Sequence, residues 1–393
     1  MFTLAKPALE KLGAEITTRE IKQQPELWQE CFEAYLTHKE EVTSFLNQVI
    51  KSADSEKVKV IFTGAGTSEY VGNTIWAYLQ QHGDRKHFIF QSIASTDLVS
   101  APAQFLYPEE TVLLVSFARS GNSPESVGAV NLVNQLIPNA YHLQITCAKE
   151  GQLAKQAIAS PKRQYLMLMP ERSNDAGFAM TGSFTSMLLS ALLIFDQSLP
   201  DSQKKTYVTA AVKMAQDIIA REDQLQTYVD LDFNRMVYLG SGSLAGLTRE
   251  AQLKVLELTA GKVATVYDST MGFRHGPKSF INPNCLVIDF VNNDPYTRQY
   301  DLDLLEEVKA DGITSKVIAF AQDGGHQFSG ETFKLLSEVK LPDVYLALPM
   351  ILAAQTLALL IAVKIGNTPD TPSASGTVNR VVKGVTLHPY PTN

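Results

Sequence analysis

The chain contains the same series of apolar runs and glycine-rich turns twice. The first series begins with Val60–Phe62 before the turn Gly64-Ala65-Gly66, and the second with Val237–Leu239 before Gly240-Ser241-Gly242. Each copy continues with two more strand-like runs, which are residues 112–117 and 142–146 in the first and residues 285–290 and 316–320 in the second. Short apolar runs that alternate with helical stretches are typical of a parallel sheet with crossover helices. The repeat therefore predicts a duplicated α/β domain.

The 393 residues are enough for two such domains with additional segments. We expect each domain to be a doubly wound parallel sheet flanked by helices. The predicted organisation is a helical N-terminal arm (1–50), a first α/β domain (51–200), a helical connector (201–234), a second α/β domain (235–366) and a C-terminal tail that closes the site (367–393).

Composition and charge exclude several classes of protein. The net charge of -7 argues against a nucleic-acid-binding protein, which needs a basic face. The three scattered cysteines indicate free thiols in a reducing compartment, and the absence of Cys-x-x-Cys argues against a metal site. The N-terminus does not have the pattern of a signal peptide. We expect a cytoplasmic protein that binds neither nucleic acid nor a membrane.

One apolar segment, Val344–Ile365, is nearly long enough to cross a bilayer. Pro349 and Gln355 interrupt it, and the first copy has a corresponding apolar stretch at Phe184–Phe195. Two apolar segments at equivalent places in a repeat favour buried helices over a single membrane span.

The first glycine-rich turn is a candidate anion site. Glycines let the backbone turn tightly and approach a ligand closely, and the N–H groups at the start of a helix favour an anion. Gly66 would bring the backbone near the ligand, while Thr67 and Ser68 would add hydroxyl donors. The same pattern is compatible with a nucleotide-binding fold, or with a glycine turn that serves packing only.

The second run of the first copy ends in another loop of small polar residues, 118–126. Ser120, Asn122 and Ser123 could surround a phosphate, and Pro124 suits the first turn of a helix. The loop has no Gly-Lys-Ser/Thr, so it is not a P-loop for nucleotide hydrolysis. Two hydroxyl-rich strand ends favour a site for a sugar phosphate. The alternative is a loop that caps a helix and binds no ligand.

These residues resemble the sugar isomerase (SIS) domain family, whose characteristic loop is Ser-x-Ser-Gly-x-Thr/Ser. The segment Ala118–Ser123 matches it except at Ala118, so one phosphate contact is lost, replaced or supplied by Arg119. The doubled arrangement is similar to the isomerase half of glucosamine-6-phosphate synthase. The segments Ser116–Glu125 and Gly272–Pro277 most resemble the AgaS proteins of amino-sugar catabolism.

The resemblance implies two tandem SIS domains and an activity that converts galactosamine 6-phosphate and water to tagatose 6-phosphate and ammonia. This reaction needs no metal or organic cofactor, because every step is acid–base or electrostatic chemistry. The substrate is then a small sugar phosphate.

The second copy lacks the hydroxyl loop but carries ionisable residues. Its counterpart, Phe290–Pro295, is acidic and unsuited to phosphate. Lys254 and Glu257 are three residues apart on a predicted helix, so they share a face, and Lys254 is a predicted substrate-binding residue. A surface ion pair is the simple interpretation, but the apolar neighbours favour partial burial. By resemblance, Glu257 corresponds to the synthase's catalytic glutamate, which would move a proton between C2 and C1.

The tight loop Gly272–Pro277 should display His275 rather than bury it. By resemblance, His275 opens the sugar ring and reaches the site of a neighbouring subunit, which implies a homodimer. Near the chain end, Lys383 corresponds to a family lysine that lies at the sugar. It could form an imine or stabilise an enediolate, and the alternative is a solvent-exposed lysine of the tail.

The other wall of the site is predicted to come from residues 173–183, with Ala179 among the substrate-binding residues. Met180 and Gly182 stand where the synthase has serine and lysine. This departure could tune which epimer fits.

Four other functions remain open. A ketose/aldose phosphate isomerase would use the same residues without handling an amine, and a glucosamine-6-phosphate deaminase would differ only at the C4 hydroxyl. A sugar-phosphate-sensing regulator would leave the ionisable residues idle, and no basic helix-turn-helix accompanies the repeat. A dinucleotide-dependent oxidoreductase would need an acidic residue at the end of its second strand, where Asp97 is poorly placed.

Overall fold

The computed structural model describes residues 1–54, 56–373, 376, 379–380, 382 and 384–391. These form two compact units. We call them the β1–β5 unit and the β6–β10 unit, after their strands. The β1–β5 unit comprises Glu30–Asp175, Gly182–Lys204 and Val378–Asn393, and the β6–β10 unit comprises Met1–Gln29, Ala176–Thr181 and Lys205–Thr377.

The β1–β5 unit is built on a five-stranded parallel sheet with the order β2-β1-β3-β4-β5. Every residue of the three central strands is buried, as expected for a sheet covered by helices on both faces. The strands are β1 (Val58–Thr63), β2 (Phe88–Ser92), β3 (Val112–Ala118), β4 (Ala140–Thr146) and β5 (Gln164–Leu168). The helices are most of α3 (Gln24–Lys51), α4 (Thr67–His82), α5 (Ser95–Ser100), η1 (Pro102–Gln104), α6 (Pro124–Leu136), α7 (Gln152–Ala159), η2 (Glu171–Ser173) and α8 (Gly182–Phe195).

The β6–β10 unit contains a second five-stranded parallel sheet, with the order β10-β9-β8-β6-β7. Its strands are β6 (Arg235–Gly240), β7 (Ala264–Ser269), β8 (Cys285–Phe290), β9 (Lys316–Ala321) and β10 (Glu331–Lys334). Its helices are α1 (Lys6–Lys11), α2 (Glu15–Lys22), most of α9 (Asp201–Ala220), α10 (Glu222–Val229), α11 (Ser243–Leu258), η3 (Gly272–His275), η4 (Pro277–Phe280), α12 (Pro295–Asp311) and α13 (Asp343–Lys364).

The two sheets have the same topology. Read from the β7 edge, the second sheet runs β7-β6-β8-β9-β10, which repeats the β2-β1-β3-β4-β5 order of the first. This is the doubly wound order in which the connections change direction between the first and third strands. The predicted duplicated α/β fold is confirmed. Ligands of such sheets bind at the carboxyl ends of the strands beside that switch point, which lies between β1 and β3 and between β6 and β8.

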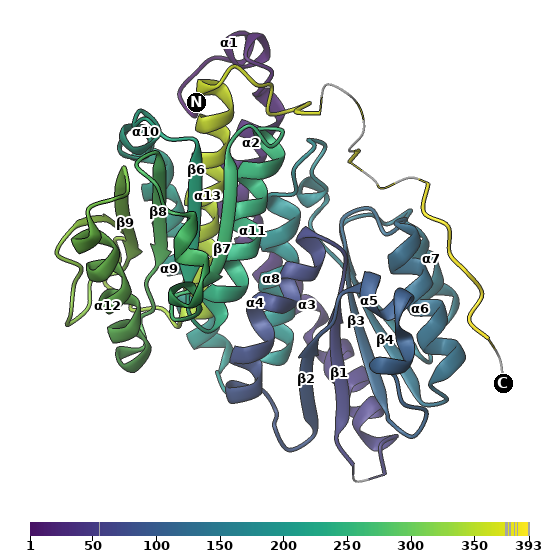
Figure 1. Cartoon of the computed structure of the whole chain (residues 1–393). Helices are drawn as coiled ribbons and strands as arrows, with labels where there is room; N and C mark the ends of the chain where they lie inside the picture. The colour runs from purple at the N-terminus through teal and green to yellow at the C-terminus, as the bar shows by residue number, and fades with distance from the viewer. Residues whose placement is uncertain (55, 374–375, 377–378, 381, 383, 392–393) are drawn as a thin grey trace. The chain divides into compact units, whose positions relative to one another are not determined.

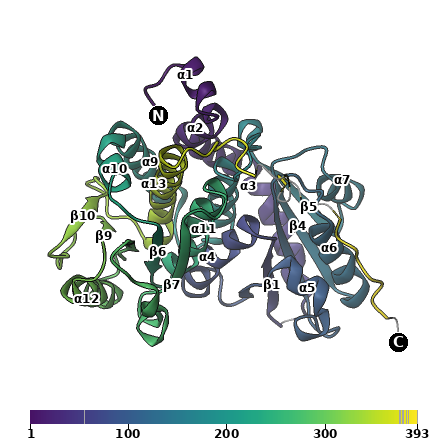
Figure 2. The same ribbon diagram turned by 45° about the horizontal axis from the view of Figure 1, so that its top comes forward.

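The apolar segments that end the two copies are buried helices, as predicted. Every residue of α8 is buried. Helix α13 is long and apolar enough to cross a membrane, but 94% of its most apolar window is buried within the protein. It packs beside α11 in both views of the β6–β10 unit (Figures 1 and 2).

The C-terminal segment packs on the β1–β5 unit where the structure describes it. It runs beside α6 in Figures 1 and 2. Gln135 Nε2 donates a hydrogen bond to the carbonyl of Tyr390 at 3.4 Å. A Cβ atom on Gly128 would lie 3.0 Å from Leu387 Cδ1, so the glycine makes room for this leucine.

Candidate functional site

The first glycine turn joins β1 to α4 in a conformation that requires glycine. Gly66 has φ 57° and ψ -129°, a region that side chains rarely allow. A Cβ atom on Gly64 would lie 2.5 Å from the carbonyl carbon of Ser68. The turn therefore places the buried residues Thr67 and Ser68 at the start of a 16-residue helix. This is the geometry that favours an anion at a helix N-terminus.

The second polar loop follows the neighbouring strand. Strand β3 pairs with β1 in parallel, and Ser116 lies opposite Thr63, so the two loops leave adjacent strand ends. Within the loop, Ser120 Oγ accepts a hydrogen bond from Asn122 N at 3.3 Å, and Asn122 Oδ1 accepts one from Gln152 N at 3.0 Å. Ser123 is the N-cap residue of α6. The structure thus gathers the predicted phosphate-binding side chains at the switch point of this sheet.

Three buried hydroxyls lie close to the same strand ends. Thr63 Oγ1, Ser95 Oγ and Ser116 Oγ have no hydrogen-bond partner within the described part of the chain. Ser95 is tied to the glycine turn, because its N–H donates to the carbonyl of Gly64 at 2.7 Å. Buried polar groups normally have a partner, so this group of hydroxyls indicates a place for water or a polar ligand.

Arg119 connects the polar loop after β3 to the C-terminal segment. It is buried, and its Nη2 donates to the carbonyl of Arg380 at 2.7 Å. Arg380 in turn donates from Nε to the carbonyl of Asp175 at 2.9 Å. The carboxylate of Asp175 accepts hydrogen bonds from Gly182 N and Ser183 N, at 3.1 and 2.9 Å. The loop, the tail and the start of α8 are therefore linked. Lys383, the predicted lysine of this segment, lies outside the described residues.

Glu257 belongs to the β6–β10 unit, on the helix that follows the second glycine turn. Lys254 Nζ lies 2.6 Å from Glu257 Oε2 and 3.2 Å from Glu250 Oε1. The side chain of Lys254 is fully buried, whereas 23% of the Glu257 side chain is exposed. Burial alone would lower the pKa of Lys254, but the two carboxylates outweigh it and raise that pKa above its ordinary value. The pair is therefore not the surface ion pair of the simple interpretation.

In the second copy, two carboxylates lie beside the ends of β6 and β8. Asp301 accepts hydrogen bonds from Ser241 Oγ at 2.5 Å and from Asn292 N and Nδ2 at 3.0 and 2.8 Å. Asp289 lies opposite Leu239 in the second sheet, as Ser116 lies opposite Thr63 in the first. Asp289 is therefore the counterpart of Ser116. Burial raises the pKa of Asp289 well above its ordinary value, and the neighbouring Asp301 raises it further. The acidic character predicted for this copy is present and is unfavourable for phosphate.

His275 is exposed at the end of η3, as the sequence predicted. The preceding Phe273 is fully buried, and Gly276 has φ 127°, which only glycine adopts readily. Ala179 is also buried, in the segment Ala176–Thr181 of the same unit. Glu20, on α2, fixes the start of this segment, because its carboxylate accepts a hydrogen bond from Ala176 N at 2.6 Å.

Comparisons with known proteins identify the family of this chain. Residues 55–196 match the family model described as the SIS domain. The chain is 43% identical to D-galactosamine-6-phosphate deaminase AgaS of Escherichia coli, over 95% of this chain and 96% of that protein. This chain belongs to the AgaS family of SIS-domain proteins.

Solved structures of related proteins share the fold. The crystal structure of tagatose-6-phosphate ketose/aldose isomerase from Escherichia coli matches with a TM-score of 0.86 and 40% identity, over 95% of this chain and 97% of that one. The C-terminal domain of glucosamine-fructose-6-phosphate aminotransferase from Francisella tularensis has a TM-score of 0.73 at 17% identity, over 90% of this chain and 98% of that one. The latter likeness concerns the fold only.

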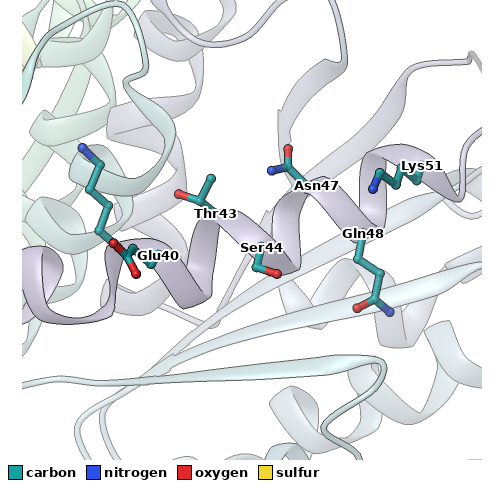
Figure 3. A pocket seen from close by; sticks show the side chains of 7 residues that line it. Glu40, Thr43, Ser44, Asn47, Gln48 and Lys51 are labelled. Carbon is teal, nitrogen blue, oxygen red and sulfur yellow. The ribbon is translucent and has the colours of Figure 1, made fainter.

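A hollow on α3 is lined by none of the predicted catalytic or substrate-binding residues. It lies along one polar face of this helix, and Figure 3 shows the side chains that line it. They are Lys39, Glu40, Thr43, Ser44, Asn47, Gln48 and Lys51. The two polar loops that follow β1 and β3 lie on other elements, and so does Glu257.

Three residues that contact the predicted site residues or their loops were not identified from the sequence. Glu250 and Glu20 are helical glutamates that are fully or almost fully buried. The loop partner Gly151 is a third, because a Cβ atom there would lie 2.4 Å from the carbonyl oxygen of Ser120. The only sequence signal was the apolar character of the residues around Glu250.

Proposed function

We propose that the protein converts galactosamine 6-phosphate and water to tagatose 6-phosphate and ammonia. The structural observation that carries the proposal is the Glu257 carboxylate, which the buried Lys254 anchors while part of its side chain stays exposed. The 43% identity to the curated deaminase over 95% of the chain supports the same activity. The C–N bond is broken by water, so the reaction is a hydrolysis combined with an isomerisation.

The proposed steps use acid–base chemistry throughout. His275 moves protons between O1 and O5, which opens the ring and exposes the C1 aldehyde. The aldehyde acidifies the C2 proton, which Glu257 removes and returns to C1. The resulting ketimine at C2 is hydrolysed by water, giving the ketose and ammonia. No metal ion or organic cofactor is needed for these steps.

We assign phosphate binding to the first copy and proton transfer to the second. Gly66, Thr67, Ser68, Ser120, Asn122 and Ser123 supply hydroxyl, amide and backbone donors for the phosphate. Arg119 supports them with its positive charge, and Lys254 orients Glu257. Ala179 contributes to the wall of the site. Lys383 is assigned an imine or an enediolate-stabilising role, which follows from the family resemblance.

The assembly and location belong to the same proposal. We infer a cytoplasmic homodimer in which His275 of one subunit serves the site of the other. The exposure of His275 supports this role, because a histidine that acts on a neighbouring molecule must be accessible.

A second candidate is ketose/aldose isomerisation of tagatose 6-phosphate without deamination. The name of the solved relative from Escherichia coli, 40% identical to this chain, favours it. The same glutamate would transfer the proton between C1 and C2. Deamination of glucosamine 6-phosphate is a further variant, which differs in the configuration at C4.

The decisive experiment measures both products. The purified protein is incubated separately with galactosamine 6-phosphate, glucosamine 6-phosphate and tagatose 6-phosphate, and ammonia and sugar phosphates are quantified. We expect ammonia and tagatose 6-phosphate from the galacto substrate. Ammonia from neither amine would overturn the deaminase proposal, and conversion of tagatose 6-phosphate to an aldose would then support the isomerase. Ammonia from the gluco substrate only would assign the other epimer.

A further inference from the structure

The loop that carries His275 is held at several points within the β6–β10 unit. Before the histidine, Phe273 is inserted into a core cluster that includes Leu304 and Val308 of α12. After it, Gly276 turns the chain with φ 127°. The ring itself is exposed. Its position therefore depends on the backbone on either side of it.

A single carboxylate binds both flanks of this histidine. Glu307 Oε2 accepts a hydrogen bond from Arg274 Nε at 2.7 Å, and Glu307 Oε1 accepts one from Lys278 Nζ at 2.5 Å. Lys278 also pairs with Asp311 at 2.6 Å, one turn further along α12. Hydrogen bonds from Lys278 and Arg274 lower the pKa of Glu307, as expected for a carboxylate between two cations.

We propose that Glu307 is a positioning residue for His275. The proposal rests on the ring-opening role assigned to His275 above. Arg274 immediately precedes the histidine and Lys278 follows it by three residues, so one carboxylate spans the segment that displays the ring. Removing this carboxylate breaks a contact on each flank at once, although Lys278 keeps its pair with Asp311, whereas removing either cation breaks a contact on one flank only.

The network is better suited to fixing geometry than to stabilising the fold. The side chains of Glu307, Arg274 and Lys278 are 38%, 26% and 25% exposed, and exposed ion pairs contribute little to stability. Phe273 and the apolar residues around it hold the loop to the core regardless of Glu307. Catalysis is more sensitive, because a displacement of about 1 Å of a reacting group can reduce the rate by roughly 100-fold.

The neighbouring Glu306 provides a matched control. It lies on the same helix with similar exposure, 42%, but its carboxylate accepts hydrogen bonds from Ser329 N and Oγ, at 2.6 and 2.7 Å. Glu306→Ala therefore removes an exposed helical carboxylate and its contacts without touching the His275 loop.

The test compares Glu307→Ala, Glu306→Ala, His275→Asn and the double variant Glu307→Ala/His275→Asn. We expect Glu307→Ala to reduce kcat for ammonia release by about 10- to 100-fold, with KM changed less than about threefold. Its melting temperature and oligomeric state should match those of Glu306→Ala, which should keep nearly full activity. In the His275→Asn background, Glu307→Ala should cause no further loss, because it acts through the histidine.

Two sets of results would overturn the proposal. The first is wild-type kcat in Glu307→Ala while His275→Asn is impaired. The second is a loss that adds fully to that of His275→Asn, or that accompanies dissociation or unfolding. The failure of the proposed function itself is distinguishable, since the wild-type protein would then release no ammonia from either amino sugar. Full activity of His275→Asn would contradict the role assigned to the histidine.

Discussion

The ammonium nitrogen of Lys254 lies 2.6 Å from Oε2 of Glu257, one turn further along α11. The lysine is fully buried, and its second partner, Glu250, is fully buried as well. The only exposed member of the triad is thus Glu257, with 23% of its side chain accessible. An arrangement of this kind fixes a carboxylate from the protein side and leaves its other side open to a ligand.

The first prediction concerns Glu257 itself. Glu257→Gln keeps the shape of the side chain and an oxygen that can accept from Lys254, but it cannot take up the C2 proton. We expect kcat for ammonia release to fall by at least about 100-fold, the usual minimum for loss of a general base. Equilibrium binding of a non-reacting sugar phosphate, measured by calorimetry, should change little. Turnover near the wild-type rate would show that another group is the base.

The second prediction concerns the buried lysine. Lys254→Met removes the ammonium that lies 3.2 Å from the buried carboxylate of Glu250, so we expect the free energy of unfolding to fall by about 3–5 kcal/mol. Urea unfolding followed by circular dichroism measures this change. The double variant Lys254→Met/Glu250→Gln should recover a large part of the loss, because the buried side chain that lost its contact with Lys254 then carries no charge. Equal stability of the single and double variants would contradict the electrostatic explanation.

The repeated fold was predictable because its signals are local. The apolar runs that form β1, β3 and β6 end at glycine or serine turns, the run that forms β8 ends before Asn292 and Asn293, and the period of the repeat indicates equivalent elements. The same reasoning identified the face shared by Lys254 and Glu257, since residues three apart on a helix are neighbours.

The contacts that complete the candidate sites were not predictable in this way. Arg119 and Arg380 are 261 positions apart, and Glu20 and Ala176 are 156 apart, so no sequence window contains either pair. From the sequence alone, Glu250 and Lys254 resemble an ordinary exposed ion pair on a helix. Their burial becomes apparent only from the packing of α13 against α11. Tertiary packing decides the burial of such residues, and a charged residue type gives no sign of it.

The third prediction concerns Gly151, which packs against the proposed phosphate-binding loop at Ser120 and Gly121. A Cβ atom there would lie 2.4 Å from the carbonyl oxygen of Ser120 and 3.2 Å from Cα of Gly121, so Gly151→Ala must displace this loop. Weakening the phosphate contacts by about 1.4 kcal/mol would raise KM roughly tenfold, with a smaller effect on kcat.

Steady-state kinetics with galactosamine 6-phosphate measures the effect of Gly151→Ala. Gly325→Ala is the control, because none of the described atoms lies within 4 Å of its new Cβ. An unchanged KM in Gly151→Ala would mean that the loop accommodates the methyl group or does not bind the phosphate. Removing a donor of the loop directly, in Ser120→Ala, separates these two explanations, because KM then rises only if the loop binds the phosphate.

The fourth prediction concerns pH and the buried Asp289. Burial and the nearby Asp301 raise its pKa in the folded protein, so the folded state binds this proton more tightly than the unfolded state does. The stability that this proton provides is present at low pH and decreases as the pH rises above the ordinary carboxyl pKa of 3.8. Asp289→Asn needs no proton and can still bond to Thr270, which lies 3.2 Å away. The variant should therefore become increasingly more stable than the wild-type protein as the pH rises.

Urea unfolding of the variant and the wild-type protein between pH 5 and pH 8 tests whether the stability difference grows in this direction. The groups that face Asp289, which are Thr270 and Asp301, remain in the variant, and so does Asp343, whose pKa burial raises to about 6. Their contributions largely cancel in the difference between the two proteins. Asp303→Asn, at an exposed position of α12, controls for the change in net charge. A stability difference for Asp289→Asn that is constant with pH, or that shrinks as the pH rises, would mean that Asp289 is not held protonated by its surroundings.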